Sequence, residues 1–116
     1  MDIRTKRIYE QPESKDGIRI LVDRLWPRGL SREQAQLDAW YKDLAPSTEL
    51  RRWYNHDPGK WNEFRSRYFL ELQNQPEQVR KLLKFLGKSP ATLLFGAKEA
   101  QYNNAVALKE YLESRD

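Results

Sequence analysis

Two short segments of this 116-residue chain contain side chains suited to binding an anion. The first follows an apolar run and reads DRLWPRG (residues 23–29). The second follows another apolar run and reads GAKE (residues 96–99), and two adjacent asparagines come shortly after it. Arginine presents a planar fork of N–H donors that matches carboxylate and phosphate groups, and lysine adds a point charge. These segments predict a ligand site formed by Arg24, Arg28, Lys98, Asn103 and Asn104.

Acid–base chemistry at such a site has two candidates, Asp23 and His56. Asp23 ends the first apolar run, and His56 is the only histidine, the side chain that exchanges protons near neutral pH. Both residues also have structural explanations. Asp23 is placed to pair with Arg24 or to cap a turn, while His56 precedes Asp57-Pro58, where any polar turn residue fits. Similarly, Asn103 and Asn104 are placed to cap a helix.

Several classes of site are excluded or left without support. The chain has no cysteine, which excludes disulfides, a thiolate nucleophile and cysteine-bound metal. It also lacks the glycine-rich phosphate-binding loops, the HExxH zinc motif, the EF-hand loop and the GxSxG serine motif. We therefore expect no cofactor and no metal ion.

The elements that must position these residues are short buried strands and amphipathic helices. Residues 18–23 (IRILVD) and 91–95 (ATLLF) are nearly continuous apolar runs, which is typical of strands buried on both faces of a parallel sheet. Residues 3–9 form a third predicted strand. Ligands bind outside the carboxyl ends of parallel strands, so both charged segments are expected to flank one cleft.

Capping signals place five helices between and after these strands. They begin at Ser31 with Gln34, after Ser47, at Asp57-Pro58, at Pro76 and at about Asn103. Residues 37–44 fit either a helix or a strand. Strands alternating with helices in a chain of this length predict one α/β domain over residues 1–116.

The charge balance leaves a second function open. Lys and Arg number 21 against 17 Asp and Glu, a net charge of +4 that permits an anionic partner. Five basic residues recur on two adjacent predicted helices: Arg65, Arg67, Arg80, Lys81 and Lys84. If they form one face, the protein is a nucleic-acid or protein-interaction module. No apolar stretch approaches the roughly 20 residues that span a bilayer, so we expect a cytoplasmic protein with no membrane partner. The oligomeric state stays open.

Three long motifs resemble the YeaO-like bacterial family of unknown function. They are VDRLWPRGLSRE, LDAWYKDLAPSTELRRWYNHDPGKW and TLLFGAKEAQYNNAVALKEYL, and the resemblance covers nearly the whole chain. It implies a cytoplasmic, Rossmann-like three-layer α/β fold with a small, mostly parallel sheet of three to five strands, one of them within residues 37–44. The motif residues are Asp23, Arg24, Trp26, Pro27, Arg28, Ser47, Arg51, Trp53, His56, Asp57, Lys98, Asn103 and Asn104.

The sequence departs from this family at two positions. Glu99 stands where relatives usually have aspartate, and Tyr102 stands where they often have histidine. A wider related group often has a cysteine near Gly96, which this chain lacks. The resemblance also adds Arg51 to the predicted anion site. The resulting prediction is an enzyme or binding domain for a phosphate- or nucleotide-like anion, held by Arg24, Arg28, Arg51 and Lys98. Asn103 and Asn104 would orient that ligand, and Asp23 and His56 would be the catalytic residues.

Overall fold

The computed structural model describes residues 1–115 and confirms the α/β fold. Four parallel strands form one sheet in the order β1-β4-β2-β3, so the two central strands are far apart in the chain. The strands are β1 (Ile3–Arg7), β2 (Ile18–Leu21), β3 (Ala39–Trp40) and β4 (Ala91–Phe95). All five residues of β4 are buried, as the continuous apolar run predicts for a central parallel strand.

Five α-helices complete the fold of residues 1–115, and three of them begin at the predicted serine and asparagine caps. They are α1 (Arg32–Ala35), α2 (Thr48–Tyr54), α3 (Trp61–Gln73), α4 (Pro76–Leu86) and α5 (Asn104–Glu113). The side chains of Ser31, Ser47 and Asn103 each accept a hydrogen bond from a first-turn N–H of α1, α2 and α5. No helix within the described chain is long and apolar enough to cross a membrane.

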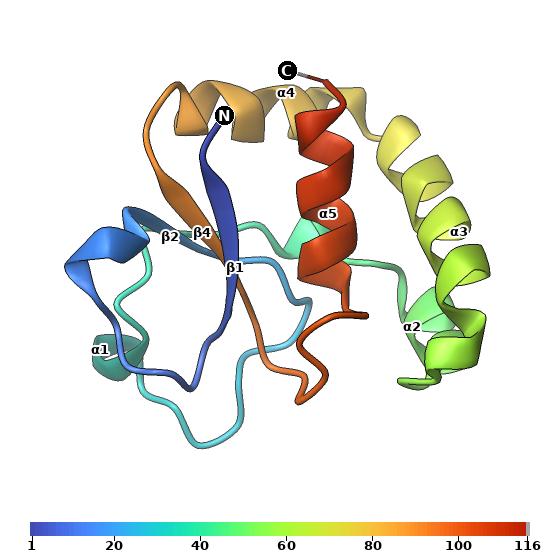
Figure 1. Ribbon diagram of the computed structural model, residues 1–116, viewed down its shortest axis with the longest axis horizontal. Coiled ribbons are helices and arrows are strands. Elements are labelled where there is room, and N and C mark those ends of the chain that lie inside the picture. Colours follow the sequence, from blue (N-terminus) through green and yellow to red (C-terminus); the bar gives the residue numbers. More distant parts are fainter. Residues whose placement is uncertain (116) are drawn as a thin grey trace.

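The two faces of the sheet are covered unequally. Helices α2 to α5 contribute to the main core, where Phe64, Tyr68 and Leu108 pack against Ile20 and Leu93 of the sheet. The opposite face carries a smaller core under α1 and its flanking loops, built around Leu21 and Leu94. Figure 1 shows α3 and α5 on one side of the strands and α1 on the other.

Residues 37–44 resolve into a short strand and a turn. Only Ala39 and Trp40 pair with β2, and residues 42–44 then form a 3₁₀ turn. This turn brings Leu44 into the main core with no exposed surface, and the hydroxyl of Tyr68 donates a hydrogen bond to its carbonyl oxygen. Burial of Leu44 against the helices therefore ends the strand early.

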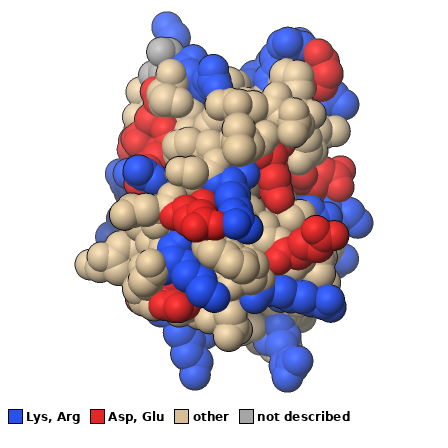
Figure 2. Space-filling view, turned by 90° about the vertical axis from the view of Figure 1, so that its right-hand side faces the viewer, with Lys and Arg blue, Asp and Glu red and all other residues tan. Residues whose placement is uncertain are grey.

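The basic residues of α3 and α4 are mostly paired with carboxylates. Arg65 lies 2.7 Å from Glu110, Arg80 lies 2.5 Å from Glu77, and Arg67 pairs with Glu63. Lys81 and Lys84 have no ion-pair partner within residues 1–115. Figure 2 shows basic and acidic side chains interspersed on the face that includes α3, rather than a continuous basic surface.

Candidate functional site

A cleft of about 540 Å³ opens beside the carboxyl ends of β2 and β4, and the chain's connections explain its position. The segment after β2 packs on the small-core face of the sheet, whereas α5, which follows β4, packs on the main core. Because connections from neighbouring strands leave toward opposite faces, a crevice forms between them, which is where α/β proteins bind ligands.

Nearly all of the predicted site residues line this cleft. The lining includes Asp23, Arg24, Arg28, Arg51, His56, Asn103 and Asn104. Lys98 lies in the loop after β4 with its side chain exposed, and it is not part of the lining. The structure thus brings together residues that are up to 81 positions apart in the chain, as in the contact between Asp23 and Asn104.

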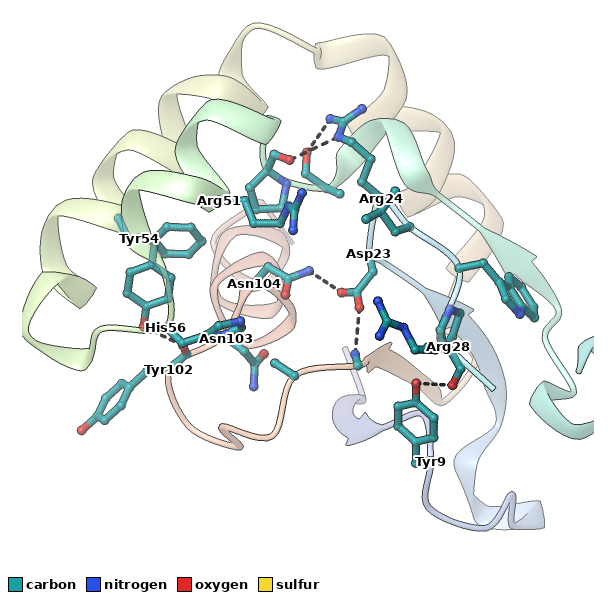
Figure 3. A pocket seen from close by; sticks show the side chains of 18 residues that line it. Tyr9, Asp23, Arg24, Arg28, Arg51, Tyr54, His56, Tyr102, Asn103 and Asn104 are labelled. Atoms are coloured by element: carbon teal, nitrogen blue, oxygen red, sulfur yellow. Dashed lines mark hydrogen bonds between the residues drawn. The ribbon is translucent and has the colours of Figure 1, made fainter. Parts of the chain in front are cut away.

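Asp23 is at the centre of the cleft and is held from two sides. Its Oδ2 accepts a hydrogen bond of 2.8 Å from the backbone N–H of Gly96. Its Oδ1 accepts one of 3.0 Å from the Asn104 side-chain amide, which also donates to the carbonyl oxygen of Val22 at 3.0 Å. Gly96 and Asn104 together hold the carboxylate between the ends of the two central strands (Figure 3).

Burial raises the pKa of Asp23 above the ordinary carboxyl value. The hydrogen bonds from Asn104 and Gly96, and the charges of Arg51 and His56, lower it in part. No ion pair joins Asp23 to a cation in the described part of the chain. The expected pairing of Asp23 with Arg24 is therefore not what holds this carboxylate.

Arg24 instead stabilises the wall of the cleft. Its guanidinium donates to the carbonyl oxygens of Pro46 and Ala45, at 3.4 and 3.3 Å. These two residues lie just before α2, so Arg24 ties the end of β2 to the loop that leads into that helix. Arg24 lines the cleft, but its guanidinium is directed to this loop rather than to Asp23 (Figure 3).

Arg28 and Arg51 have no such attachments. Both are exposed, and within residues 1–115 neither guanidinium forms a hydrogen bond or an ion pair. Figure 3 shows Arg51 reaching toward Asp23 from α2 and Arg28 reaching toward it from the loop after β2. The backbone of Arg28 is anchored, because the Tyr9 hydroxyl donates to its carbonyl oxygen at 2.8 Å. The cleft thus contains two positioned cations that are available to a ligand.

The two asparagines have different structural tasks. Asn103 is 4% exposed and caps α5, accepting from the N–H of Val106 at 3.0 Å and donating to the carbonyl oxygen of Glu99 at 2.7 Å. The capping interpretation thus accounts for Asn103, whereas Asn104 holds Asp23. Both line the cleft, so the positive end of the α5 dipole adds to the charge of the arginines there.

His56 lies on an exposed turn after α2. Its backbone has φ 54°, and Asn55 before it has φ 46°, so two successive residues adopt the left-handed conformation. Asparagine and histidine tolerate this conformation better than most residues do. The turn leads to Asp57, which caps the next turn by accepting from the N–H of Gly59 at 2.9 Å. No metal-binding cluster of His, Asp or Glu exists within residues 1–115.

Several lining residues were not predicted from the sequence. Tyr9 follows the end of β1, so the strand-end rule used for β2 and β4 would have located it. Tyr54 of α2 and Tyr102 close one side of the cleft, because the Tyr54 hydroxyl donates to the Tyr102 carbonyl oxygen at 2.7 Å. Burial raises the pKa of Tyr54 to about 12, which keeps this donor protonated. No sequence signal indicates that contact.

Comparison with known proteins gives one consistent result. A family model described as the inactive DUF488-N3 subclade matches residues 2–115. The chain is 41% identical over 114 residues to the uncharacterized protein YeaO of Escherichia coli K12, covering 98% of this chain and 99% of that protein. It is 38% identical over 113 residues to uncharacterized proteins of Mycobacterium bovis and Mycobacterium tuberculosis, covering 97% of this chain and 95% of theirs. No solved structure matches significantly.

Proposed function

The chain belongs to the YeaO-like DUF488 family, and from this membership and the chemistry of the cleft we propose that it binds a small anion. The ligand carries a phosphate or carboxylate group and lies at the carboxyl ends of β2 and β4. The matching subclade is described as inactive, which favours binding without chemical conversion.

The observation that carries this proposal is the pair of unattached arginines, Arg28 and Arg51, on either side of one cleft. Arginine side chains that meet at a concave surface form charge-assisted, bidentate hydrogen bonds with carboxylate or phosphate groups. The cleft volume of about 540 Å³ lies within the usual range for small-molecule sites. Arg24 and the N-terminus of α5 add positive potential without needing to touch the ligand.

Neighbouring arginines on α2 provide a matched test. Arg51 lines the cleft, whereas Arg52 is exposed outside it and has no ion pair among residues 1–115. We expect Arg51→Ala to weaken binding of ribose 5-phosphate about 10- to 100-fold, since a hydrogen bond to a charged group contributes roughly 1.5–3 kcal/mol. Arg52→Ala, measured by the same calorimetric titration, should bind like the natural protein.

The proposal fails if neither inorganic phosphate nor ribose 5-phosphate binds, or if the two arginine variants lose affinity equally. Equal losses would mean that only the overall charge matters. Arg28→Ala tests the opposite side of the cleft and should resemble Arg51→Ala.

Catalysis is the alternative function, and Asp23 and His56 are its candidate acid–base residues. Incubation with ribose 5-phosphate, followed by phosphorus NMR, would show any released phosphate. Release that disappears in both Asp23→Asn and His56→Ala would replace the binding proposal with a hydrolase. We expect no release.

A further inference from the structure

A carboxylate at the centre of a basic cleft needs a chemical explanation. Asp23 lies between Arg28 and Arg51, the two residues that we propose hold the ligand's anionic group. An ionised carboxylate repels an anion, so Asp23 weakens binding unless another part of the ligand interacts with it. The following inference rests on the proposed anion-binding function.

The protein fixes this carboxylate without saturating it. An ionised carboxylate has about four positions for accepting hydrogen bonds, and Gly96 and Asn104 occupy one on each oxygen of Asp23. Asp23 is only partly buried and lines the cleft, so its other acceptor positions are open to a ligand. A side chain at position 96 would crowd this arrangement, because its Cβ would lie 3.2 Å from Oδ2.

The surrounding charges restrict which donor fits. Arg24, Arg28 and Arg51 all line the same cleft, and an ammonium or guanidinium group on the ligand would be repelled by them. A neutral hydroxyl is not repelled, and it can donate directly to the carboxylate. Such a charge-assisted O–H···O⁻ bond is among the stronger hydrogen bonds in proteins.

We propose that the ligand is a hydroxylated anion. Arg28 and Arg51 bind its phosphate or carboxylate group, and Asp23 accepts a hydrogen bond from a hydroxyl that lies a few bonds away from that group. Sugar phosphates and polyol phosphates have this chemistry. Asp23 then acts as the residue that determines specificity, because it disfavours plain anions and favours those that bring a donor.

Two phosphate esters of equal chain length test the inference. Glycerol 3-phosphate has two hydroxyls, and propyl phosphate has the same carbon chain and phosphate group with none. Titration of ¹⁵N-labelled protein followed by NMR gives both affinities, even when they are weak. We expect glycerol 3-phosphate to bind about 10- to 100-fold more tightly. The Gly96 N–H signal, which reports on Asp23, should shift more strongly with it than with propyl phosphate at equal saturation.

Two variants separate the parts of the argument. Asp23→Asn replaces one acceptor oxygen with a donor and should abolish the preference for glycerol 3-phosphate. Arg51→Ala should weaken both esters by the same factor. If Asp23→Asn does not fold, the affinity ratio and the Gly96 signal of the natural protein decide the question.

Each contrary outcome has a distinct meaning. Equal affinity for the two esters would overturn the hydroxyl inference and leave the anion-binding proposal intact. A preference that persists in Asp23→Asn would assign the hydroxyl to another residue and overturn it as well. Absence of binding by both esters would overturn the anion-binding proposal and this inference together.

Discussion

Two aspartates of this protein respond to burial in opposite ways. Burial raises the pKa of Asp23, and its two hydrogen bonds offset this only in part. Burial alone would also raise the pKa of Asp16, but hydrogen bonds from the backbone of Glu13 and from Lys6 and Arg19 outweigh it and lower the pKa. Asp16 is therefore stabilised in its charged form by the fold itself, whereas the fold disfavours the charged form of Asp23, which is typical of functional sites.

The opposite shifts predict opposite pH dependences of stability. A raised pKa in the folded state means that folding binds a proton, so Asp23 lowers the free energy of unfolding as the pH rises from the ordinary carboxyl value through its folded pKa. The Asp23→Asn variant has no carboxyl group at this position, so it does not lose this stability as the pH rises. We expect the stability of Asp23→Asn, relative to the natural protein, to improve as the pH rises above the ordinary carboxyl value of about 4, as measured by urea denaturation.

Asp16→Asn is the control for this measurement. Its lowered pKa gives stability that is present above the ordinary carboxyl value and is lost as the pH falls through the folded pKa. The relative stability of Asp16→Asn should therefore worsen as the pH rises toward the ordinary carboxyl value of about 4 and stay constant above it. If both variants show the same trend, the environment of Asp23 has been described wrongly.

For single residues, the sequence predicted which side chains line the cleft better than it predicted the contacts that these side chains make. Asp23 and Arg28 directly follow a strand, and strand ends meet at one edge of a parallel sheet. Lys98 follows a strand too, but hydrogen bonds from Arg7 of β1 and from the α5 cap set the path of its loop. Arg7 donates to the carbonyl oxygens of Gly96 and Ala97, and Asn103 donates to that of Glu99. The spacing of residues in the sequence predicts none of these hydrogen bonds.

Among the elements, α5 connects the stability of the fold to the site. Its N-terminal residues hold Asp23, and its buried face packs in the main core through Leu108 and Leu112. Its cap, Asn103, makes two hydrogen bonds. Because α5 both packs in the core and holds Asp23, loss of its N-cap should also disturb the cleft.

We expect Asn103→Ala to lower the free energy of unfolding by about 1–2 kcal/mol, because the first turn of α5 loses its acceptor. Asn103→Ser should lose less, since serine is also a good cap. Urea denaturation measures both. Ser31→Ala removes the cap of the four-residue helix α1 and serves as a control that should leave the Gly96 N–H signal unmoved. Equal stability of the two Asn103 variants would contradict the capping role.

Element boundaries show where sequence reasoning ends. Ser31, Ser47 and Asn103 were predictable as caps because a cap depends on residues that are close in the chain. The residues themselves left 37–44 open between helix and strand, and only the family resemblance implied a strand there, because its two-residue length depends on pairing with Ile20 and Leu21 and on burial of Leu44. Both of these are tertiary effects.

On the scale of the whole molecule, buried charges also tie the layers together. Arg19 of β2 is 5% exposed, lies 2.6 Å from Asp16 and donates to the carbonyl oxygen of Ala35 at 2.8 Å. Lys6 of β1 binds the same aspartate at 3.1 Å. This network lies away from the cleft and joins two strands to α1, so these charges serve the fold rather than a ligand.

The distribution of the remaining charge bears on the two functions proposed from the sequence. A nucleic-acid module needs several cations on one face, and affinity then falls steeply as salt displaces them. Here three of the five basic residues on α3 and α4 pair with glutamates, which leaves Lys81 and Lys84. We therefore expect a 20-nucleotide single strand to bind more weakly than about 10⁻⁴ M at physiological salt, as measured by fluorescence anisotropy.

The double variant Lys81→Glu/Lys84→Glu makes this prediction specific. If oligonucleotide binding is tight, steep in salt and abolished by that variant, then the helical face is the functional surface and the cleft is secondary. If the variant changes nothing while Arg51→Ala weakens binding of ribose 5-phosphate about 10- to 100-fold, anions bind in the cleft and not on the two helices. The second result is expected because the cleft brings together two arginines that have no ion pair within residues 1–115, at the switch point of a parallel sheet, whereas most cations of α3 and α4 are paired with carboxylates.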